Sequence, residues 1–203
     1  MANAIAKAMK SGSHLLVQAG TGTGKSLGYI IPAILRAVTS DRKGGNHRTV
    51  IATATIALQR QLVTNDLPKA MQALGPILET DVRYAVLKGR NNYVCLEKFH
   101  RDTKVDDEDE NLSLFEGNQS YLARQAKKLR QWVSTTSTGD RDDFGDEIDG
   151  RLWRSLSVSG RECIGKNKCV WGDQCFAEAA RDAAFESDIV VTNHTMLALD
   201  VIE

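Results

Sequence analysis

The feature that most constrains the fold is a glycine-rich segment, AGTGTGKS at residues 19–26, between an apolar run and a helical pattern. The run HLLVQ (14–18) predicts a buried strand, and residues 25–38 have helical spacing. A strand, a glycine-rich turn and a helix in this order favour a phosphate-binding loop, in which backbone N–H groups face phosphate oxygens. The strict pattern begins with glycine where this chain has Ala19, but the strand ends there and the extra methyl group need not touch a ligand.

Each position of this loop has an expected role. The glycines supply a permissive backbone, Lys25 would reach the β- and γ-phosphates of a nucleotide, and the Ser26 hydroxyl would ligate Mg²⁺. A glycine-rich turn with an accidental GKS is the alternative, and the flanking strand and helix patterns argue against it. Lys25 and Ser26 are the predicted catalytic pair, and the predicted nucleotide-binding set is Ala19, Gly20, Thr21, Gly22, Thr23, Gly24, Lys25 and Ser26.

The order of patterns predicts an α/β fold with an insertion. Further strands are expected at 48–54, 82–89 and 188–194, and helices at 4–10, 56–74, 119–132 and 176–186. Strands separated by helices favour a parallel sheet. Residues 100–160 break this order and show no dense hydrophobic pattern, which is typical of a surface insertion. The expected organisation is a first α/β part at 1–90, an insertion at 91–180 and a return to the first part at 181–203.

Composition and charge narrow the class of protein. The chain has 203 residues, of which 42% are hydrophobic and 26% charged, so it is globular, and no run is long enough to span a membrane. With no secretory signal pattern, the cytoplasm is the expected location. Residues 1–100 carry thirteen Lys and Arg against five Asp and Glu, whereas residues 101–150 carry seven against thirteen. The basic part is therefore the candidate for contact with phosphates or nucleic acid.

Four cysteines form a second constellation. Cys163, Cys169 and Cys175 recur at intervals of six, and Cys95 lies far upstream in GRNNYVC. Zinc sites more often show two close pairs, whereas an iron–sulfur cubane takes one thiolate per iron and tolerates longer spacers. Spacing alone leaves a cluster, a zinc site and buried free thiols open.

The combination of AGTGTGKS, TATIALQRQL (53–62), the four cysteines and VVTNH (190–194) resembles the DinG and XPD family of iron–sulfur superfamily 2 DNA helicases, bacterial DinG-like members most closely. The resemblance covers essentially the whole chain, and an alanine-first loop is usual in that family. It implies a RecA-like first motor domain with a mostly helical iron–sulfur insertion. It also implies ATP and Mg²⁺ at the loop, and a 4Fe–4S cluster held by Cys95, Cys163, Cys169 and Cys175.

The resemblance further implies a monomeric 5′-to-3′ helicase that acts on single-stranded DNA and duplex junctions, with DNA contacts at Thr53, Thr55 and Gln59. Lys88 and Arg90 form a basic lip for which phosphate contact and a solvated face are both open. Trp153 and Trp171 are expected to cover the cluster, with base stacking as the alternative. The aspartate–glutamate box and the second motor domain of the family are not in the 203 residues, so we expect this chain alone to be inactive as an ATPase. A non-catalytic nucleic-acid-binding fragment and a P-loop NTPase with a zinc module are the alternative functions.

Overall fold

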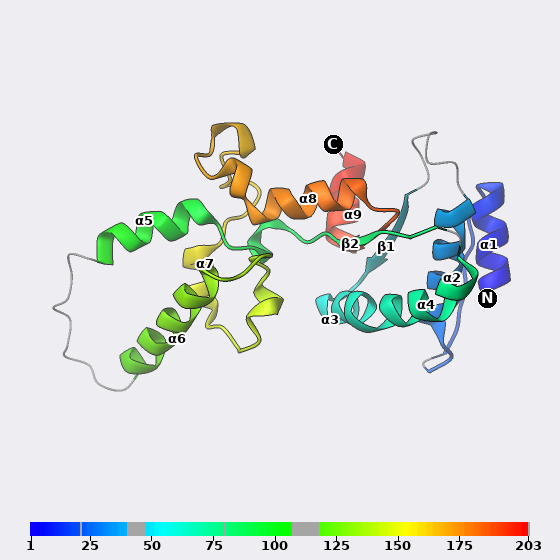
Figure 1. The fold of residues 1–203 in the computed structure, drawn as a ribbon, viewed down its shortest axis with the longest axis horizontal. Coiled ribbons are helices and arrows are strands. Elements are labelled where there is room, and N and C mark those ends of the chain that lie inside the picture. Colours follow the sequence, from blue (N-terminus) through cyan, green and yellow to red (C-terminus); the bar gives the residue numbers. More distant parts are fainter. Residues whose placement is uncertain (21, 40–47, 79, 107–117, 203) are drawn as a thin grey trace. The chain divides into compact units, whose positions relative to one another are not determined.

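The computed structural model describes residues 1–20, 22–39, 48–78, 80–106 and 118–202. The chain forms two compact units (Figure 1). Unit 1 comprises Met1–Leu87 and Ala183–Glu203, and unit 2 comprises Lys88–Asp182. Unit 2 is thus inserted between two segments that together build unit 1. None of the helices in the described ranges is both long and apolar enough to cross a bilayer.

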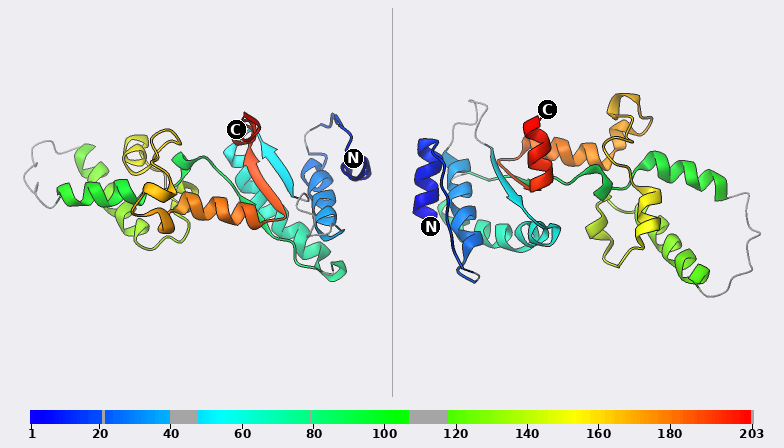
Figure 2. Two further views of the ribbon diagram at one scale, coloured as in Figure 1. Left: turned by 90° about the horizontal axis from the view of Figure 1, so that it is seen from above. Right: turned by 180° about the vertical axis from the view of Figure 1, so that it is seen from behind.

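Unit 1 is built on a parallel three-stranded sheet in the order β1-β3-β2, where β1 is Thr49–Thr53, β2 is Tyr84–Val86 and β3 is Ile189–Asn193. The central strand is therefore the last one in the sequence, and α9 (His194–Ile202) follows it directly (Figure 2). The first four residues of β3 are buried, as expected of a parallel strand that is apolar on both faces. The α/β class is confirmed.

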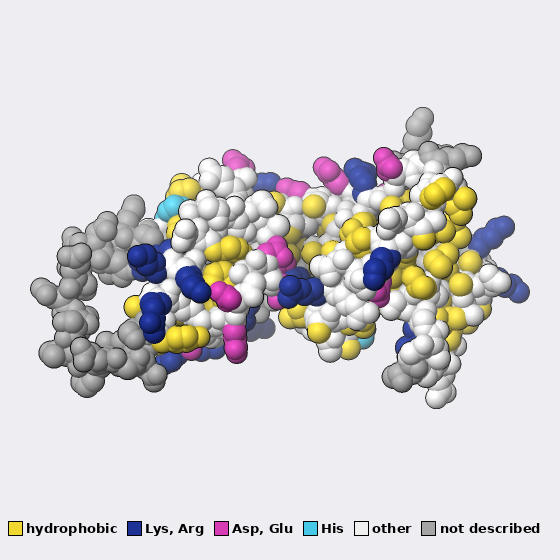
Figure 3. Space-filling model, turned by 60° about the horizontal axis from the view of Figure 1, so that its bottom comes forward, with side chains coloured by type: hydrophobic (Ala, Val, Ile, Leu, Met, Phe, Trp, Pro, Cys, Tyr) yellow, Lys and Arg dark blue, Asp and Glu magenta, His cyan; other side chains and the backbone are white. Residues whose placement is uncertain are grey.

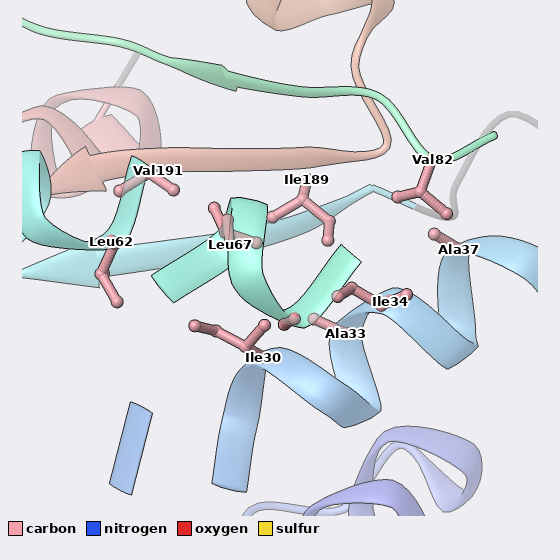
Figure 4. Close-up of a cluster of buried hydrophobic side chains, with 10 residues drawn as sticks. Ile30, Ala33, Ile34, Ala37, Leu62, Leu67, Val82, Ile189 and Val191 are labelled. Carbon is pink, nitrogen blue, oxygen red and sulfur yellow. The ribbon is translucent and has the colours of Figure 1, made fainter. Parts of the chain in front are cut away.

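The helices of unit 1 pack their apolar faces on one another and on this sheet. Besides α9 and the end of α8 (Phe176–Glu186), they are α1 (Ala2–Ser11), α2 (Lys25–Thr39), α3 (Ile56–Gln61) and α4 (Leu67–Leu74), with a π-helical turn at Leu62–Asp66 and a 3₁₀ turn at Gly75–Ile77. Figure 4 shows Ile30 and Ile34 of α2 facing Leu67 and the β3 residues Ile189 and Val191. These five side chains are fully buried, so this layer fixes the helix that begins at the glycine-rich loop.

The prediction of a strand at residues 14–18 is wrong, because the structure assigns no strand to these residues. This segment has no strand partner in the part of the chain that the structure describes. Leu16 is 98% exposed, and Leu15 and Val17 are also exposed. A parallel strand needs a hydrogen-bonded neighbour, and β1, β2 and β3 pair only with one another. The apolar pattern is therefore present without the burial that it predicts.

Unit 2 is mainly helical, and its described residues contain one isolated antiparallel bridge, between Tyr93 and Asp140, in place of a sheet. Its α-helices are α5 (Leu96–Asp106), α6 (Asn118–Val133), α7 (Gly150–Leu156) and the first part of α8 (Phe176–Glu186), and its 3₁₀ turns are Arg90–Asn92, Arg141–Phe144, Lys166–Lys168 and Gly172–Gln174. The sequence placed the insertion at 91–180, close to the bounds of this unit.

Unit 2 also has a hydrophobic core, which the sequence did not predict between residues 100 and 160. Leu129 and Val133 of α6 pack with Ile148 and Trp153, and all four are at most 5% exposed. The apolar residues that meet here come from α6, from a loop and from α7. Leu129 and Val133 have the four-residue spacing of one helix face, but no single helical or strand period connects them to Ile148 and Trp153.

Candidate functional site

The glycine-rich loop folds around the side chain of Lys25, the first residue of α2. The Lys25 ammonium donates hydrogen bonds to the carbonyl oxygens of Ala19 at 3.0 Å and Gly20 at 2.7 Å. The Thr23 hydroxyl also donates to the Gly20 carbonyl, at 2.9 Å. The ammonium is thus held against the loop by neutral acceptors, which anionic phosphate oxygens can replace with stronger, charge-assisted bonds.

The backbone of the loop requires glycine at two positions. Gly22 and Gly24 both have a φ of 73°, in the left-handed region that residues with a Cβ rarely adopt. Ser26 follows Lys25 in the first turn of α2 and is half-buried. The free N–H groups of this first turn and the positive end of the helix dipole make the region suitable for an anion. Thr21 lies outside the described residues.

The predicted DNA-contacting residues lie where β1 leads into α3. Thr55 is exposed and caps α3, because its hydroxyl accepts a hydrogen bond from the Leu58 N–H at 3.2 Å. Thr53 is buried and donates to the Thr55 carbonyl at 2.9 Å. Gln59 is also fully buried, and its amide nitrogen donates to the carbonyls of Leu87 and Val191 at 3.2 and 3.3 Å. Of the three, only Thr55 is open to a ligand, while the other two tie α3 to the sheet.

All four cysteines line one pocket in unit 2, although Cys95 is far from the other three in sequence. The pocket wall also contains Arg90, Tyr93, Val94, Val158, Trp171 and Glu178. The described residues contain no group of three or more His, Cys, Asp or Glu side chains arranged to hold a single metal ion. The fold thus brings the predicted ligands together around a shared space without converging them on one point.

Two of these cysteines stand at the beginning of a helix. The Cys95 carbonyl accepts from the Phe99 N–H at 3.0 Å, and the Cys175 carbonyl accepts from the Ala179 N–H at 2.9 Å, so the two residues directly precede α5 and α8 and accept from their first turns. Burial raises the pKa of the Cys95 thiol; hydrogen bonds from the Lys98 and Glu97 N–H groups oppose this, and the nearby thiols raise it further. Helix N-termini stabilise anions, so a thiolate at these two positions is less unfavourable than one in an apolar pocket without a helix N-terminus.

Two glycines shape the loop that carries the other cysteines. Gly165 has a φ of 84° and its N–H donates to the Cys163 sulfur at 3.4 Å. A Cβ on Gly172 would lie 2.2 Å from the backbone oxygen of Lys166, closer than atoms can approach. The loop therefore passes over itself only because residue 172 has no side chain. Neither glycine belongs to a motif, and sequence reasoning did not identify them.

Lys88 and Arg90, the predicted basic lip, both form ion pairs within unit 2. The Lys88 ammonium is buried and pairs with Asp140 at 2.6 Å and Asp142 at 2.7 Å. Arg90 pairs with Glu178, beside the cysteine pocket. Burial lowers the pKa of Arg90, but the Glu178 bond and the negative charge of Cys163 and Cys175 together raise it. Both cations are already paired with carboxylates from distant parts of the sequence. The geometry therefore favours structural roles for Lys88 and Arg90 over contact with the phosphates of a nucleic acid.

The two tryptophans near the cysteines differ in position. Trp171 lines the cysteine pocket and stacks on His100, with ring centroids 4.0 Å apart. Trp153 is only 3% exposed and donates its ring N–H to the Asn91 carbonyl at 2.7 Å. Trp153 belongs to the core of unit 2, so neither cluster cover nor base stacking describes its position. Trp171 lies beside the cysteines, and its role as cover for a bound cluster stays a prediction.

The loop and the sheet of unit 1 can be compared with known families. Residues 2–106 match the family described as DEAD/DEAH box helicase, and this match includes the glycine-rich loop, α3 and Cys95. The chain belongs to the DEAD/DEAH box helicase family. The match ends before Cys163, so the cysteine pocket of this family member is only partly covered by it.

Individual relatives of this DEAD/DEAH box helicase cover the whole chain. It is 47% identical over 206 residues to the ATP-dependent helicase DinG of Mycobacterium tuberculosis, a match that covers 100% of this chain and 30% of the relative. It is 33% identical over 204 residues to the ATP-dependent DNA helicase YoaA of Escherichia coli, covering 100% of this chain and 28% of the relative. It is 34% identical over 203 residues to a protein named 3'-5' exonuclease DinG of Bacillus subtilis, covering 98% and 19%. The chain thus spans less than a third of the length of these relatives.

Proposed function

We propose that the chain supplies the nucleotide-binding part of an ATP-dependent DNA helicase, in which ATP hydrolysis drives movement along single-stranded DNA and opening of duplex junctions. The observation that carries this proposal is the loop of residues 19–26 at the N-terminus of α2, with Lys25 held at its carbonyls, in a member of a helicase family. The name of the Escherichia coli relative, an ATP-dependent DNA helicase, supports DNA as the substrate. A 5′-to-3′ polarity and a monomeric state rest on the family resemblance.

At the loop, Lys25 would exchange the carbonyls of Ala19 and Gly20 for the β- and γ-phosphate oxygens of ATP. Ser26 would provide a hydroxyl ligand to Mg²⁺, and the N–H groups from Gly20 to Gly24 would bind the remaining oxygens. These residues bind and orient the triphosphate. They do not activate water, and hydrolysis therefore needs further groups.

In unit 2, we propose that Cys95, Cys163, Cys169 and Cys175 hold a 4Fe–4S cluster. The donor set supports this, because all four thiols line one pocket. A cubane takes one thiolate on each iron, so its ligands need not converge on one point. Arg90 and the starts of α5 and α8 would balance the negative charge of the thiolates. The bound group would cross-link the loop at 163–175 to α5.

For DNA, the proposed contact in unit 1 is the start of α3. Thr55 presents the exposed end of this helix. Gln59 acts as a positioning residue that fixes the helix to β3 through a buried hydrogen bond to the Val191 carbonyl, and Thr53 of β1 holds the segment before the helix through its bond to the Thr55 carbonyl. Exposed hydroxyl side chains commonly contact nucleic-acid phosphates. Thr55 would therefore contact a DNA phosphate without reading its sequence.

The proposal is tested by titrating a fluorescent ADP analogue, with Mg²⁺, into the 203-residue chain and its Lys25→Ala variant. Loss of a charge-assisted contact should weaken binding roughly tenfold or more. Lys7→Ala, an exposed cation on α1, is the matched control and should leave the affinity unchanged. Equal nucleotide binding by the Lys25 variant would contradict the assignment. A chain that carries a cluster but binds no nucleotide would support the non-catalytic alternative, and stoichiometric zinc without colour would support the NTPase with a zinc module.

A further inference from the structure

A basic face on α6 is the feature of unit 2 that the cysteine pocket does not explain. Residues 118–133 carry four cations, Arg124, Lys127, Lys128 and Arg130, and no carboxylate. Gln125, Leu129 and Val133 form the opposite, buried face, each at most 8% exposed. Gln125 is also fixed by hydrogen bonds with the Glu147 carbonyl and the Asp149 N–H, at 2.7 and 2.9 Å. The rotation of α6 is therefore set by its core contacts, and the cations face outward.

The outward residues form one stripe. Arg124, Lys127, Lys128 and Gln131 follow the three- and four-residue spacing of a single helix face, and all four are exposed. In the space-filling view, dark-blue side chains gather over the end of unit 2 where α6 runs (Figure 3). Among the described residues, Arg124 and Lys127 have no ion pair, and Lys128 has one long exposed contact, 3.5 Å to Asp146. We call Arg124, Lys127 and Lys128 the α6 basic stripe.

This arrangement costs helix stability unless an anion is present. Arg124 is three residues from Lys127 and four from Lys128, and like charges at these spacings destabilise a helix by about 0.2–0.5 kcal/mol per pair. An ordinary solvated helix would alternate signs, with carboxylates between the cations. A row of phosphates, spaced along a nucleic-acid backbone, would relieve this repulsion. Such a row is opposite in charge to the stripe and extended like it.

An exposed aromatic ring extends the stripe. Tyr121 precedes Arg124 by three residues and Gln125 by four, so it lies at the border between the stripe and the buried face, and it is 56% exposed. Its hydroxyl accepts from the buried Gln125 amide at 3.4 Å, which holds the ring in place. Basic residues beside an exposed ring are typical of single-strand sites, because unpaired bases stack on the ring while the cations follow the phosphates. Bases in a duplex are already stacked and do not offer their faces.

We infer that the α6 basic stripe and Tyr121 form a binding site for single-stranded DNA on unit 2. This inference rests on the proposed function for its choice of DNA as the polyanion. The stripe would contact successive phosphates without sequence preference, and Tyr121 would stack on one base. The residues of this site belong to unit 2, whereas the start of α3 and the nucleotide loop belong to unit 1.

The test is fluorescence anisotropy of a labelled oligothymidylate with the 203-residue chain over a series of NaCl concentrations. The variant Arg124→Gln, Lys127→Gln, Lys128→Gln should bind more weakly, and the slope of log affinity against log salt should shrink by about 2, since each single-strand phosphate contact contributes about 0.7. The matched control is Lys7→Gln, Lys10→Gln, Lys69→Gln, which removes the same charge from exposed positions of unit 1. It should leave the slope nearly unchanged.

Tyr121 is tested separately. Tyr121→Ala should weaken binding of oligothymidylate by roughly fivefold or more while the salt slope stays the same, and it should not affect an abasic oligonucleotide. Tyr121→Phe keeps the ring and should bind as the unaltered chain does. Unchanged urea midpoints by tryptophan fluorescence would show that these variants remain folded.

Each failure has a distinct meaning. An unchanged salt slope in the triple α6 variant, or an equal loss in the unit 1 control, would overturn the inference while nucleotide binding through Lys25 left the proposed function standing. A preference for duplex DNA, or equal competition by polyglutamate, would also overturn it by identifying another occupant. If the unaltered chain binds no oligothymidylate at low salt, both the α6 site and the DNA part of the proposed function are wrong.

Discussion

Replacing Lys88 with methionine should destabilise unit 2 strongly at neutral pH. The Lys88 and Asp140 side chains are 6% and 8% exposed, and Asp142 is 28% exposed, with both carboxylates within 2.7 Å of the ammonium. Methionine keeps most of the apolar stem and removes the charge, so two carboxylates lose their cation, and Asp140 keeps the hydrogen bond from the Asp142 N–H. Removing one partner of a buried ion pair costs about 3–5 kcal/mol. The partial exposure of Asp142 places the expected loss toward the lower end of this range.

The loss should depend on pH. Burial raises the pKa of Asp140, although the hydrogen bond and the charge of Lys88 oppose this. A carboxyl whose folded pKa is above its unfolded value favours folding at low pH, and this contribution is lost as the pH rises through the folded pKa. Methionine removes an interaction that lowers this pKa, so Asp140 should hold its proton to higher pH in the variant. The destabilisation should therefore be small near pH 4 and grow toward pH 7.

Urea unfolding followed by tryptophan fluorescence measures this effect, because Trp132, Trp153 and Trp171 all lie in unit 2. Lys128→Met is the matched control, since it breaks an exposed pair in the same unit, with side chains 70% and 62% exposed. Exposed pairs contribute up to about 1 kcal/mol. If Lys88→Met costs no more than Lys128→Met, or if its cost does not grow with pH, the buried network does not stabilise the unit and a surface role for Lys88 would regain support.

Three further changes test the cysteine loop and α3. Replacing any one of the four cysteines with serine should abolish the brown colour of protein purified without oxygen and its content of about four irons per chain. Unit 2 should keep its helical circular dichroism, because it has a hydrophobic core of its own. Colourless protein that contains zinc would contradict the cluster. Gly172→Ala should lower the iron content in the same assay, because the new methyl group would overlap the Lys166 carbonyl. Gly160→Ala is the control and should leave the iron content unchanged, since a Cβ at this position has no atom within 4 Å. Equal iron content in the two variants would refute the packing argument. Thr55→Ala should lower the stability of unit 1 by about 1 kcal/mol through the lost helix cap, measured by circular dichroism; no change in stability would mean that the hydroxyl does not cap α3.

Local patterns determined much of the site. The glycines of residues 20–24 and the GKS that ends the loop predict a phosphate-binding turn because the required backbone angles and the lysine lie within one short segment. Helical spacing in the same way predicted α2 and the region of α6. The four cysteines were recognisable as a set, but their spacing left the bound group open, since ligand identity depends on how far apart the sulfurs lie in space.

Contacts between distant segments were decided only by the tertiary structure. Lys88 was expected at the surface because nothing near it in sequence signals Asp140 and Asp142, which reach it through the fold. The need for glycine at position 172 also depends on the fold, because the Lys166 backbone lies where a side chain would be. The run at 14–18 had the composition of a buried strand, yet burial requires a neighbouring strand, and composition cannot supply one. Residue types fix what a segment can do, whereas pairing, charge neutralisation and steric fit depend on which other segments the fold brings beside it.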